Sequence, residues 1–273
     1  MNLNSNKIYL VAEIGWNFLG RLSLAKKMII SAKNSGADCV KFQIWNPKYL
    51  KSGPWDYDGR RLIYEKAYLN KTKYALLNKF CEKNKMKCFS SIFSKTEIKS
   101  YREITSDIVK IPSSEACNFE LINLCLKKFK LVMISCGALK KKELKRLLSL
   151  VRGKKVILMH CVSSYPLKSS NANFAKFKFL KSKLKNIGYS GHFEGIEDAI
   201  YAIDLGAKVI EKHFTINNNL EGRDNKFALL PQDFKFLKRY ILLKKDFDKN
   251  KGLDIQKCEL DIYKNYRGRW QLQ

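Results

Sequence analysis

Eight short apolar segments alternate with eight amphipathic segments along most of this chain. The apolar segments are rich in β-branched residues, have the length of buried strands, and lie at residues 8–15, 38–43, 87–92, 108–112, 131–136, 155–161, 187–191 and 209–214. A segment with helical periodicity follows each of them. Strict strand–helix alternation builds a parallel sheet. Eight repeats favour closure into a TIM (β/α)8 barrel, an α/β fold, over a doubly wound open sheet.

The chain length fits a single barrel. Such a barrel needs about 250 residues, and the sequence has 273. We expect a (β/α)8 barrel catalytic domain over residues 1–250 and a C-terminal tail over residues 251–273 that forms no separate domain. Residues 45–70, after the second predicted strand, form the longest irregular stretch and are rich in Gly, Pro, Tyr and Arg. A loop of this length is typical of an active-site lid.

The formal net charge is +28, from 53 Lys and Arg residues against 25 Asp and Glu residues. Such a charge raises the question of nucleic-acid binding. Only ten of the basic residues are arginines, and the basic residues are spread along the chain instead of gathered in one arm or stripe. We therefore expect a lysine-rich solvated surface and no nucleic-acid partner. The positive field of this surface would attract an anionic substrate.

The eight cysteines form no C-x-x-C pair, and several lie inside predicted strands. The chain starts with a polar segment that lacks the apolar core of a signal peptide, and no apolar stretch reaches the roughly 18 residues of a membrane span. We therefore expect reduced thiols, a cytoplasmic protein and no membrane partner.

Polar residues gather at the carboxyl ends of the predicted strands. A barrel strand is buried on both faces, so a polar residue in it needs a reason, and TIM-barrel enzymes build their active sites at this end. The residues concerned are Glu13, Lys41, Gln43, Ser90, Ser91, Lys110, Ser113, Ser114, Glu115, Ser135, His160, Ser163, Ser164, Tyr165, Ser190, His192, Glu211, Lys212 and His213. Their convergence from eight strand ends predicts an active site there.

The residue types indicate the chemistry of this site. Buried lysines and a ring of serine hydroxyls suit a small anion that carries phosphate and carboxylate groups. His192 and His213 end adjacent strands, and two imidazoles in one polar pocket suit a divalent transition metal. The third histidine, His160, lies inside an apolar strand, and we interpret it as structural.

Seven motifs, in order along the chain, resemble those of the sialic acid synthase family, which includes N-acetylneuraminate, legionaminate and pseudaminate synthases. They are AEIGWNFLG (12–20), KFQ (41–43), KIPSSE (110–115), ISCG (134–137), HCVSSYP (160–166), GYSGH (188–192) and EKHFT (211–215). The resemblance implies a TIM-barrel transferase that condenses phosphoenolpyruvate with an N-acylated amino-hexose into a nonulosonic acid and inorganic phosphate. It also implies a divalent metal, usually Mn²⁺ (Mg²⁺ or Co²⁺ being alternatives), a homodimer, and a place in surface polysaccharide biosynthesis.

The resemblance also assigns roles to individual residues. It implies that His192 and His213 bind the metal. The residues implied to bind phosphoenolpyruvate are Lys41, Gln43, Ser91, Lys110, Ser113, Ser135, Ser163 and Ser190, and those implied to face the sugar are Glu13, Tyr165 and Asp224. Glu13, Lys41 and Lys110 would take part in catalysis, and Glu115 would activate water.

Four positions depart from the family motifs. Phe18, Cys136, Gly191 and Asn225 stand where the family usually has His, Thr, Asp and His. We expect these changes to lie near the sugar and to alter the acceptor. The family's C-terminal antifreeze-like domain has no counterpart in these 273 residues, so we expect a barrel-only member in which another segment closes the site.

Two alternatives remain open at this stage. A Schiff-base aldolase on the same barrel would use Lys41, Lys110 or Lys212 as its nucleophile, but it leaves the histidine pair without a role. A basic, non-catalytic nucleic-acid-binding protein would show salt-dependent binding to any duplex.

Overall fold

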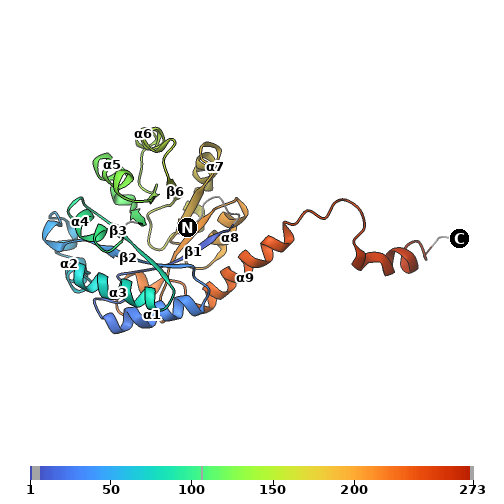
Figure 1. The fold of residues 1–273 in the computed structure, drawn as a ribbon, viewed down its shortest axis with the longest axis horizontal. Coiled ribbons are helices and arrows are strands. Elements are labelled where there is room, and N and C mark those ends of the chain that lie inside the picture. The colour runs from blue at the N-terminus through green and yellow to red at the C-terminus, as the bar shows by residue number, and fades with distance from the viewer. Residues whose placement is uncertain (2–6, 106, 271–273) are drawn as a thin grey trace.

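The computed structural model describes residues 1, 7–105 and 107–270, and it contains a closed barrel of eight parallel strands in sequence order (Figure 1). The strands are β1 Tyr9–Gly15, β2 Cys39–Ile44, β3 Lys87–Ile92, β4 Ile108–Ile111, β5 Leu131–Ser135, β6 Val156–His160, β7 Ile187–Gly191 and β8 Val209–His213. Strand β8 pairs with β1 and closes the barrel. The predicted TIM barrel is confirmed, and each predicted strand agrees with the structure to within one residue at either end.

An outer ring of helices covers the barrel. Its members are α1 Leu22–Asn34, α3 Lys71–Lys83, α4 Thr96–Arg102, α5 Phe119–Lys128, α6 Lys141–Val151, α7 Phe174–Lys183, α8 Glu197–Asp204 and α9 Pro231–Phe247. Helix α6 shows why these segments pack as they do. Its buried residues Leu144, Leu147 and Val151 recur at helical spacing on one face, whereas basic residues such as Lys141, Lys142 and Lys145 are exposed. No helix among the described residues is long and apolar enough to span a membrane.

Residues 45–70 are less irregular than predicted. They contain two short 3₁₀ turns and helix α2, Arg60–Lys66. Ion pairs stabilise the segment: Arg61 contacts Asp56 at 2.6 Å, and Lys66 contacts Glu221 of the β8–α9 connection at 3.2 Å. The segment therefore has contacts both within itself and with the nearby β8–α9 connection.

The barrel interior has two kinds of layer. Toward the amino ends of the strands it is filled by apolar side chains such as Val11, Phe89, Met133 and Ile157. Toward the carboxyl ends the inward-facing residues are polar and buried: Glu13, Lys41, Ser91, Lys110, Ser135, Ser190, Glu211 and His213. The polar layer therefore lies on an apolar floor.

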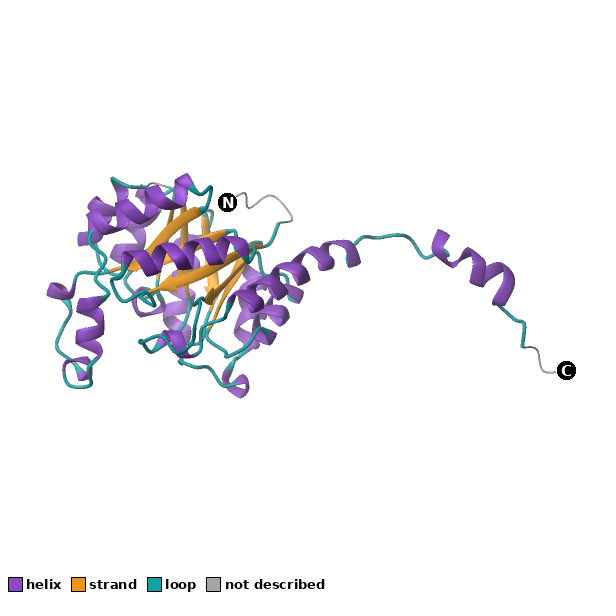
Figure 2. Cartoon of the chain, turned by 90° about the horizontal axis from the view of Figure 1, so that it is seen from below, coloured by secondary structure: helices purple, strands orange, loops and turns teal. Residues whose placement is uncertain are grey.

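The chain leaves the barrel after α9 (Figures 1 and 2). Residues 257–270 are exposed, and they include a short helical turn over Ile262–Tyr266 with the exposed aromatic side chains of Tyr263 and Tyr266.

A buried ion pair lies outside the barrel, between β8 and α8. The Lys212 ammonium is 2.9 and 3.0 Å from the two carboxylate oxygens of Asp198, and it donates to the Phe193 carbonyl at 2.7 Å. The Tyr189 hydroxyl also donates to Asp198, at 2.8 Å. A Cβ on Gly191 would overlap the Asp198 carboxylate and the Tyr189 ring.

This arrangement corrects one expectation from the sequence. Gly191 stands where the family usually has aspartate. A side chain at this position would not face the sugar; it would point toward α8 on the outer side of the barrel. The missing side chain makes room for Asp198, which supplies a carboxylate to Lys212 from α8.

We predict that Gly191→Ala destabilises the fold by about 3 kcal/mol, because the added methyl group displaces Asp198 and leaves the buried Lys212 ammonium without its partner. Backbone strain does not confuse the result, since the φ angle of Gly191 lies outside the left-handed region. Urea unfolding followed by circular dichroism measures the change. An unchanged midpoint would mean that the Asp198–Lys212 pair is not held by this contact.

Candidate active site

A cavity of about 370 Å³ opens at the carboxyl ends of the strands. All the residues to which the resemblance gives a role except Glu115 line it: Glu13, Lys41, Gln43, Ser91, Lys110, Ser113, Ser135, Ser163, Tyr165, Ser190, His192, His213 and Asp224. These side chains are far apart in the sequence, and barrel closure brings them together because each follows or ends a strand. Of the other polar residues expected at the strand ends, Ser90, His160, Ser164 and Lys212 do not line it.

The centre of the cavity is a network of two lysines and two glutamates. Lys41 contacts Glu13 at 2.7 Å, and Lys110 contacts both carboxylate oxygens of Glu211 at 2.9 Å. Lys41 also lies 3.6 Å from Glu211 and so joins the two pairs. No side chain of the four is more than 6% exposed. Buried charges of this kind are tolerated only when they are paired and hydrogen-bonded.

Three neutral side chains complete the hydrogen bonds of this network. Lys41 donates to the Ser91 hydroxyl at 2.9 Å, Gln43 donates to Glu13 at 2.6 Å, and Ser190 donates to Glu211 at 3.1 Å. Three of the positions predicted for anion binding thus also hold the charged groups in place.

The two glutamates differ in how readily they ionise. Burial raises the pKa of Glu13 to about 7, although Lys41 opposes the shift. Burial also acts on Glu211, but Lys110 and Lys41 outweigh it and lower the pKa of Glu211 to about 2. The second lysine makes the difference, because Glu211 lies close to both ammonium groups. Glu13 is therefore a group in this cavity that can exchange a proton near neutral pH.

Two serine hydroxyls approach the backbone at Gly137. The Gly137 N–H donates to the Ser113 hydroxyl at 3.1 Å. A Cβ on Gly137 would lie 2.6 Å from that oxygen and would also overlap the Ser163 hydroxyl. Only glycine leaves this space free, so the hydroxyls can converge beside the lysines as donors to an anion.

The two predicted metal ligands lie side by side, with ring centroids 5.5 Å apart. His192 Nδ1 lies 3.0 Å from the Val162 carbonyl, which leaves Nε2 available to a ligand. His213 Nδ1 is buried, has no hydrogen-bond partner within the described part of the chain, and lies 3.6 Å from an Asp224 carboxylate oxygen. Burial lowers the pKa of His213 well below its usual value, so its ring is neutral, as a metal ligand requires.

The structure does not place Glu115 in this cavity. Glu115 lies in the 3₁₀ turn after β4, where its carboxylate accepts from Asn118 at 3.2 Å, and it lines a neighbouring cavity. The turn explains this difference, because it directs Ser113 and Ser114 into the lysine cavity and turns the next side chain away.

Glu211 is the residue whose importance the sequence analysis missed. It was recognised as a polar strand end but received no role. The alternation of side chains along β8 could have shown its role. Glu211 shares its inward face with Val209 and His213, whereas Lys212 faces outward. His160 faces outward on β6, packs against Phe174, and bonds to the Ala172 carbonyl, in agreement with its structural interpretation.

The other departures from the family motifs also lie away from the cavity. Phe18 is buried in an edge-to-face contact with Phe42, and Cys136 is fully buried. Asn225 bonds to Thr215 and to two backbone carbonyls. None of these side chains lines the cavity, so the expectation that they contact the sugar is not supported. The mouth is instead shaped by Trp16, Arg60, Tyr64, Phe93 and Arg223.

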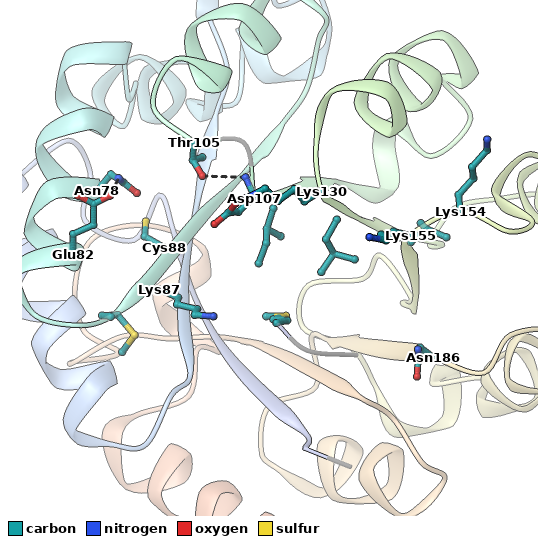
Figure 3. A pocket seen from close by; sticks show the side chains of 15 residues that line it. Asn78, Glu82, Lys87, Cys88, Thr105, Asp107, Lys130, Lys154, Lys155 and Asn186 are labelled. Atoms are coloured by element: carbon teal, nitrogen blue, oxygen red, sulfur yellow. Dashed lines mark hydrogen bonds and ion pairs between the residues drawn. The ribbon is translucent and has the colours of Figure 1, made fainter. Parts of the chain in front are cut away.

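A larger cavity, of about 690 Å³, lies at the opposite, amino-terminal end of the strands (Figure 3). Four exposed lysines surround it: Lys87, Lys130, Lys154 and Lys155. None of the predicted site residues reaches it, and in TIM-barrel enzymes this end contributes to stability and not to catalysis.

Comparison with known proteins agrees with the cavity at the carboxyl end. The model of the NeuB family matches residues 28–250. The N,N'-diacetyllegionaminic acid synthase of Campylobacter jejuni is 31% identical over 95% of this chain and 82% of its own length. A pseudaminic acid synthase of the same species is 32% identical over 86% of this chain and 73% of its own.

A solved structure of a sialic acid synthetase is also similar to this chain. The N-acetylneuraminic acid synthetase of Leptospira borgpetersenii, in complex with citrate, superposes with a TM-score of 0.85 and 29% identity over 98% of this chain and 97% of that chain. A DAHP synthase of Thermotoga maritima shares the fold, with a TM-score of 0.69 and 15% identity over 90% of this chain and 73% of that chain.

We predict that Lys110→Ala weakens phosphoenolpyruvate binding about ten- to a hundredfold, because a charge-assisted contact in a shielded cavity contributes about 1.5–3 kcal/mol. Equilibrium dialysis measures the affinity, and thermal unfolding shows whether the variant folds. Lys87→Ala, at the opposite end of the barrel, is the matched control and should bind normally. Equal affinity in the folded Lys110 variant would remove Lys110 from the anion site.

Proposed function

This chain belongs to the NeuB family, and from that premise we propose that it condenses phosphoenolpyruvate with an N-acyl amino-hexose, or a related sugar aldehyde, into a nonulosonic acid and inorganic phosphate. The observation that carries the proposal is the buried pair Lys41 and Lys110 beside the pair His192 and His213 in one cavity. Two fixed cations suit an anion with two charged ends, and two imidazoles suit a metal that binds a carbonyl oxygen.

The lysines would hold the phosphate and carboxylate of phosphoenolpyruvate, with Gln43, Ser91, Ser135 and Ser190 around them. Ser113 and Ser163 would add their hydroxyls from the converging pair at Gly137. Glu13 and Glu211 neutralise the two lysines. An entering anion competes with these carboxylates for the two lysines.

His192 and His213 would hold the metal, for which Mn²⁺ is the first candidate and Mg²⁺ or Co²⁺ are alternatives. The residues fit such an ion, since His213 Nδ1 is buried without a hydrogen bond and His192 is oriented by the Val162 carbonyl. Within the described residues no ready-made cluster of three His, Cys, Asp or Glu side chains exists, so water or substrate oxygen would complete the coordination. A bound ion would supply Lewis-acid polarisation of the sugar aldehyde.

In the proposed reaction, C3 of phosphoenolpyruvate attacks the aldehyde carbon with the electrons of its double bond, and positive charge develops on C2. The aldehyde oxygen takes up a proton and becomes a hydroxyl. Water adds to C2 and loses one proton; the C2–O bond to phosphate then breaks as the new C2 hydroxyl gives its proton to the departing phosphate and the C2 carbonyl forms. We assign the acceptance of the proton that water loses to Glu13 instead of Glu115, because Glu13 lies in the cavity and has a pKa of about 7. Lys41 and Lys110 stabilise the charge of the departing phosphate.

Asp224 and Tyr165 would bind the acceptor sugar. The Asp224 carboxylate accepts a hydrogen bond from the Trp16 indole, and burial raises the pKa of Asp224 to about 6. The Tyr165 ring lies over His192, with centroids 4.1 Å apart. These groups place hydrogen-bond partners for sugar hydroxyls next to the histidines.

Residues 45–70 would act as the lid. Arg60 and Tyr64 of this segment line the cavity mouth, and Lys66 contacts Glu221 of the β8–α9 connection. A closed mouth excludes water, which strengthens the electrostatic contacts inside. We further propose a homodimer that acts in the cytoplasm on small-molecule substrates, and a place in surface polysaccharide biosynthesis.

One observation favours the Schiff-base alternative: burial lowers the pKa of Lys110, which is the direction that a lysine nucleophile needs. Against it, both carboxylate oxygens of Glu211 hold Lys110 as an ammonium. Lys212, the third candidate, lies outside the barrel and pairs with Asp198.

Incubation of the protein with phosphoenolpyruvate and a panel of amino-hexoses should release phosphate and yield a product heavier than the sugar by one pyruvate unit. Phosphate assay and mass spectrometry measure this outcome. Activity should require Mn²⁺ or a related ion and stop in chelator. Metal-independent trapping of pyruvate by borohydride, without phosphate release, would contradict the proposal and support the aldolase.

A variant of one histidine of the pair tests the metal site in the same assay. His213→Ala should lose at least about a hundredfold in phosphate release, because polarisation by a metal contributes several kcal/mol. Its Mn²⁺ affinity, measured by equilibrium dialysis, should fall as well. His160→Ala, outside the barrel, should keep its Mn²⁺ affinity.

The pH profile tests Glu13. An ionised carboxylate accepts a proton, so kcat/KM for phosphoenolpyruvate should rise as the pH increases through about 7 and then level off. Glu13→Gln should lower the constant kcat/KM reached at high pH by at least about tenfold, and it should remove the rise near pH 7. The variant also controls for titration of the substrate itself. If the rise in kcat/KM near pH 7 remains in Glu13→Gln, the titrating group is not Glu13.

A further inference from the structure

A second cavity, of about 660 Å³, adjoins the lysine cavity. The two share Trp16, Gln43, Tyr64, Phe93 and Ser114 as lining residues. Beyond this shared wall the second cavity extends between the 45–70 segment and the connections that follow β3 and β4. We call it the loop pocket; its further lining residues are Trp45, Asn46, Tyr49, Leu50, Lys51, Trp55, Ser94, Glu97, Glu115 and Asn118.

The aromatic side chains of the loop pocket are held by one another. Trp16 stacks on Tyr64 with ring centroids 4.9 Å apart, and Trp45 meets Trp16 edge-to-face at 5.7 Å. Phe93 meets Trp45 at 5.9 Å, and the Trp45 indole donates to the Tyr64 carbonyl at 3.3 Å. The pocket is therefore preformed, with half-buried aromatic faces available to an apolar group.

The charge of the loop pocket differs from that of the lysine cavity. Two carboxylates line it, Glu97 and Glu115, against one exposed lysine, Lys51, among the described residues. Glu97 is buried and receives hydrogen bonds from Ser94 and Thr96. This surface offers acceptors for N–H or O–H groups but repels phosphate or carboxylate.

The loop pocket lies where it could receive the end of the acceptor sugar that is remote from the aldehyde. The histidines and Asp224 lie on the β7 and β8 side of the cavity, whereas the loop pocket lies past Gln43 on the β2 to β4 side. An acceptor whose aldehyde is next to the histidines would therefore direct its opposite end over Trp16 into the loop pocket. The residues that depart from the family motifs do not reach this region, so the segment 45–70 sets its shape.

We propose that the loop pocket binds an uncharged acylamino substituent, larger than acetyl, at the end of the acceptor sugar remote from its aldehyde. This inference rests on the proposed condensation. The acyl chain would pack on Trp45 and Phe93, and the amide N–H would face the carboxylate and hydroxyl acceptors. A cavity of about 660 Å³ is far larger than an acetyl group needs.

The test compares four acceptors with phosphoenolpyruvate in the full-length protein. They are 2-acetamido-2-deoxymannose, its 6-acetamido-6-deoxy and 6-butanamido-6-deoxy derivatives, and its 6-phosphate. Because each methylene in an apolar pocket changes selectivity by about tenfold or more, kcat/KM should be at least about tenfold higher for the butanamido sugar than for the acetamido sugar. The 6-phosphate should be used more poorly than the parent sugar.

Variants connect this preference to the pocket. Leu50→Trp fills the loop pocket without removing an aromatic contact, and it should abolish the preference for butanamido over acetamido. Leu62→Trp is the matched control, since Leu62 is 63% exposed and lines neither cavity; it should keep the preference. Trp45→Ala should also lower the ratio of the two kcat/KM values.

The outcomes separate this inference from the proposed function. Phosphate release with equal kcat/KM for the two acylamino sugars, or a preference unchanged in Leu50→Trp, would overturn the loop pocket as an acyl site and leave the condensation intact. Preference for the 6-phosphate would assign a charged substituent instead. Failure of these four acceptors, with phosphate release from another amino-hexose of the panel, would overturn the loop pocket as an acyl site alone, whereas failure of the whole panel would overturn both.

Discussion

Two lysines and two glutamates share the buried polar layer of one barrel, and the rest of the site depends on the pairing of their opposite charges. An unpaired charge at this depth would be strongly destabilising, so each ammonium needs a carboxylate, and each carboxylate needs further donors. Lys41 is held by Glu13, Lys110 by Glu211, and the remaining hydrogen bonds come from serine and glutamine side chains. The apolar layer beneath them keeps water from the floor of the cavity.

Lys212, the next residue on β8, also has a buried charge that needs a partner, but on the outer side of the barrel. Glu211 faces the cavity, whereas Lys212 faces α8 and is satisfied by Asp198. The two networks are therefore kept apart by the strand itself. The glycine at 191 belongs to the outer network, which explains why a change in a site motif can leave the cavity lining intact.

These observations separate the parts of the site that perform chemistry from the parts that select the substrate. The lysines, serines and histidines stand on strand ends, which the closed sheet holds rigidly. The aromatic side chains at the mouth come partly from the 45–70 segment, whose position depends on ion pairs and ring contacts. Selection of the acceptor can thus change with that segment while the anion and metal sites stay the same.

The sequence alone determined the barrel, its strand bounds and most of the cavity lining, because buried strands require apolar alternation and make every polar strand end conspicuous. It also separated His160 from the histidine pair. It could not show that Glu211 joins both lysines, that Glu115 turns away, or that Phe18, Gly191 and Asn225 serve packing. Those facts depend on distances between residues remote in sequence and on the direction of single side chains. Only the closed tertiary structure decides such contacts, because strand pairing and loop packing set them together.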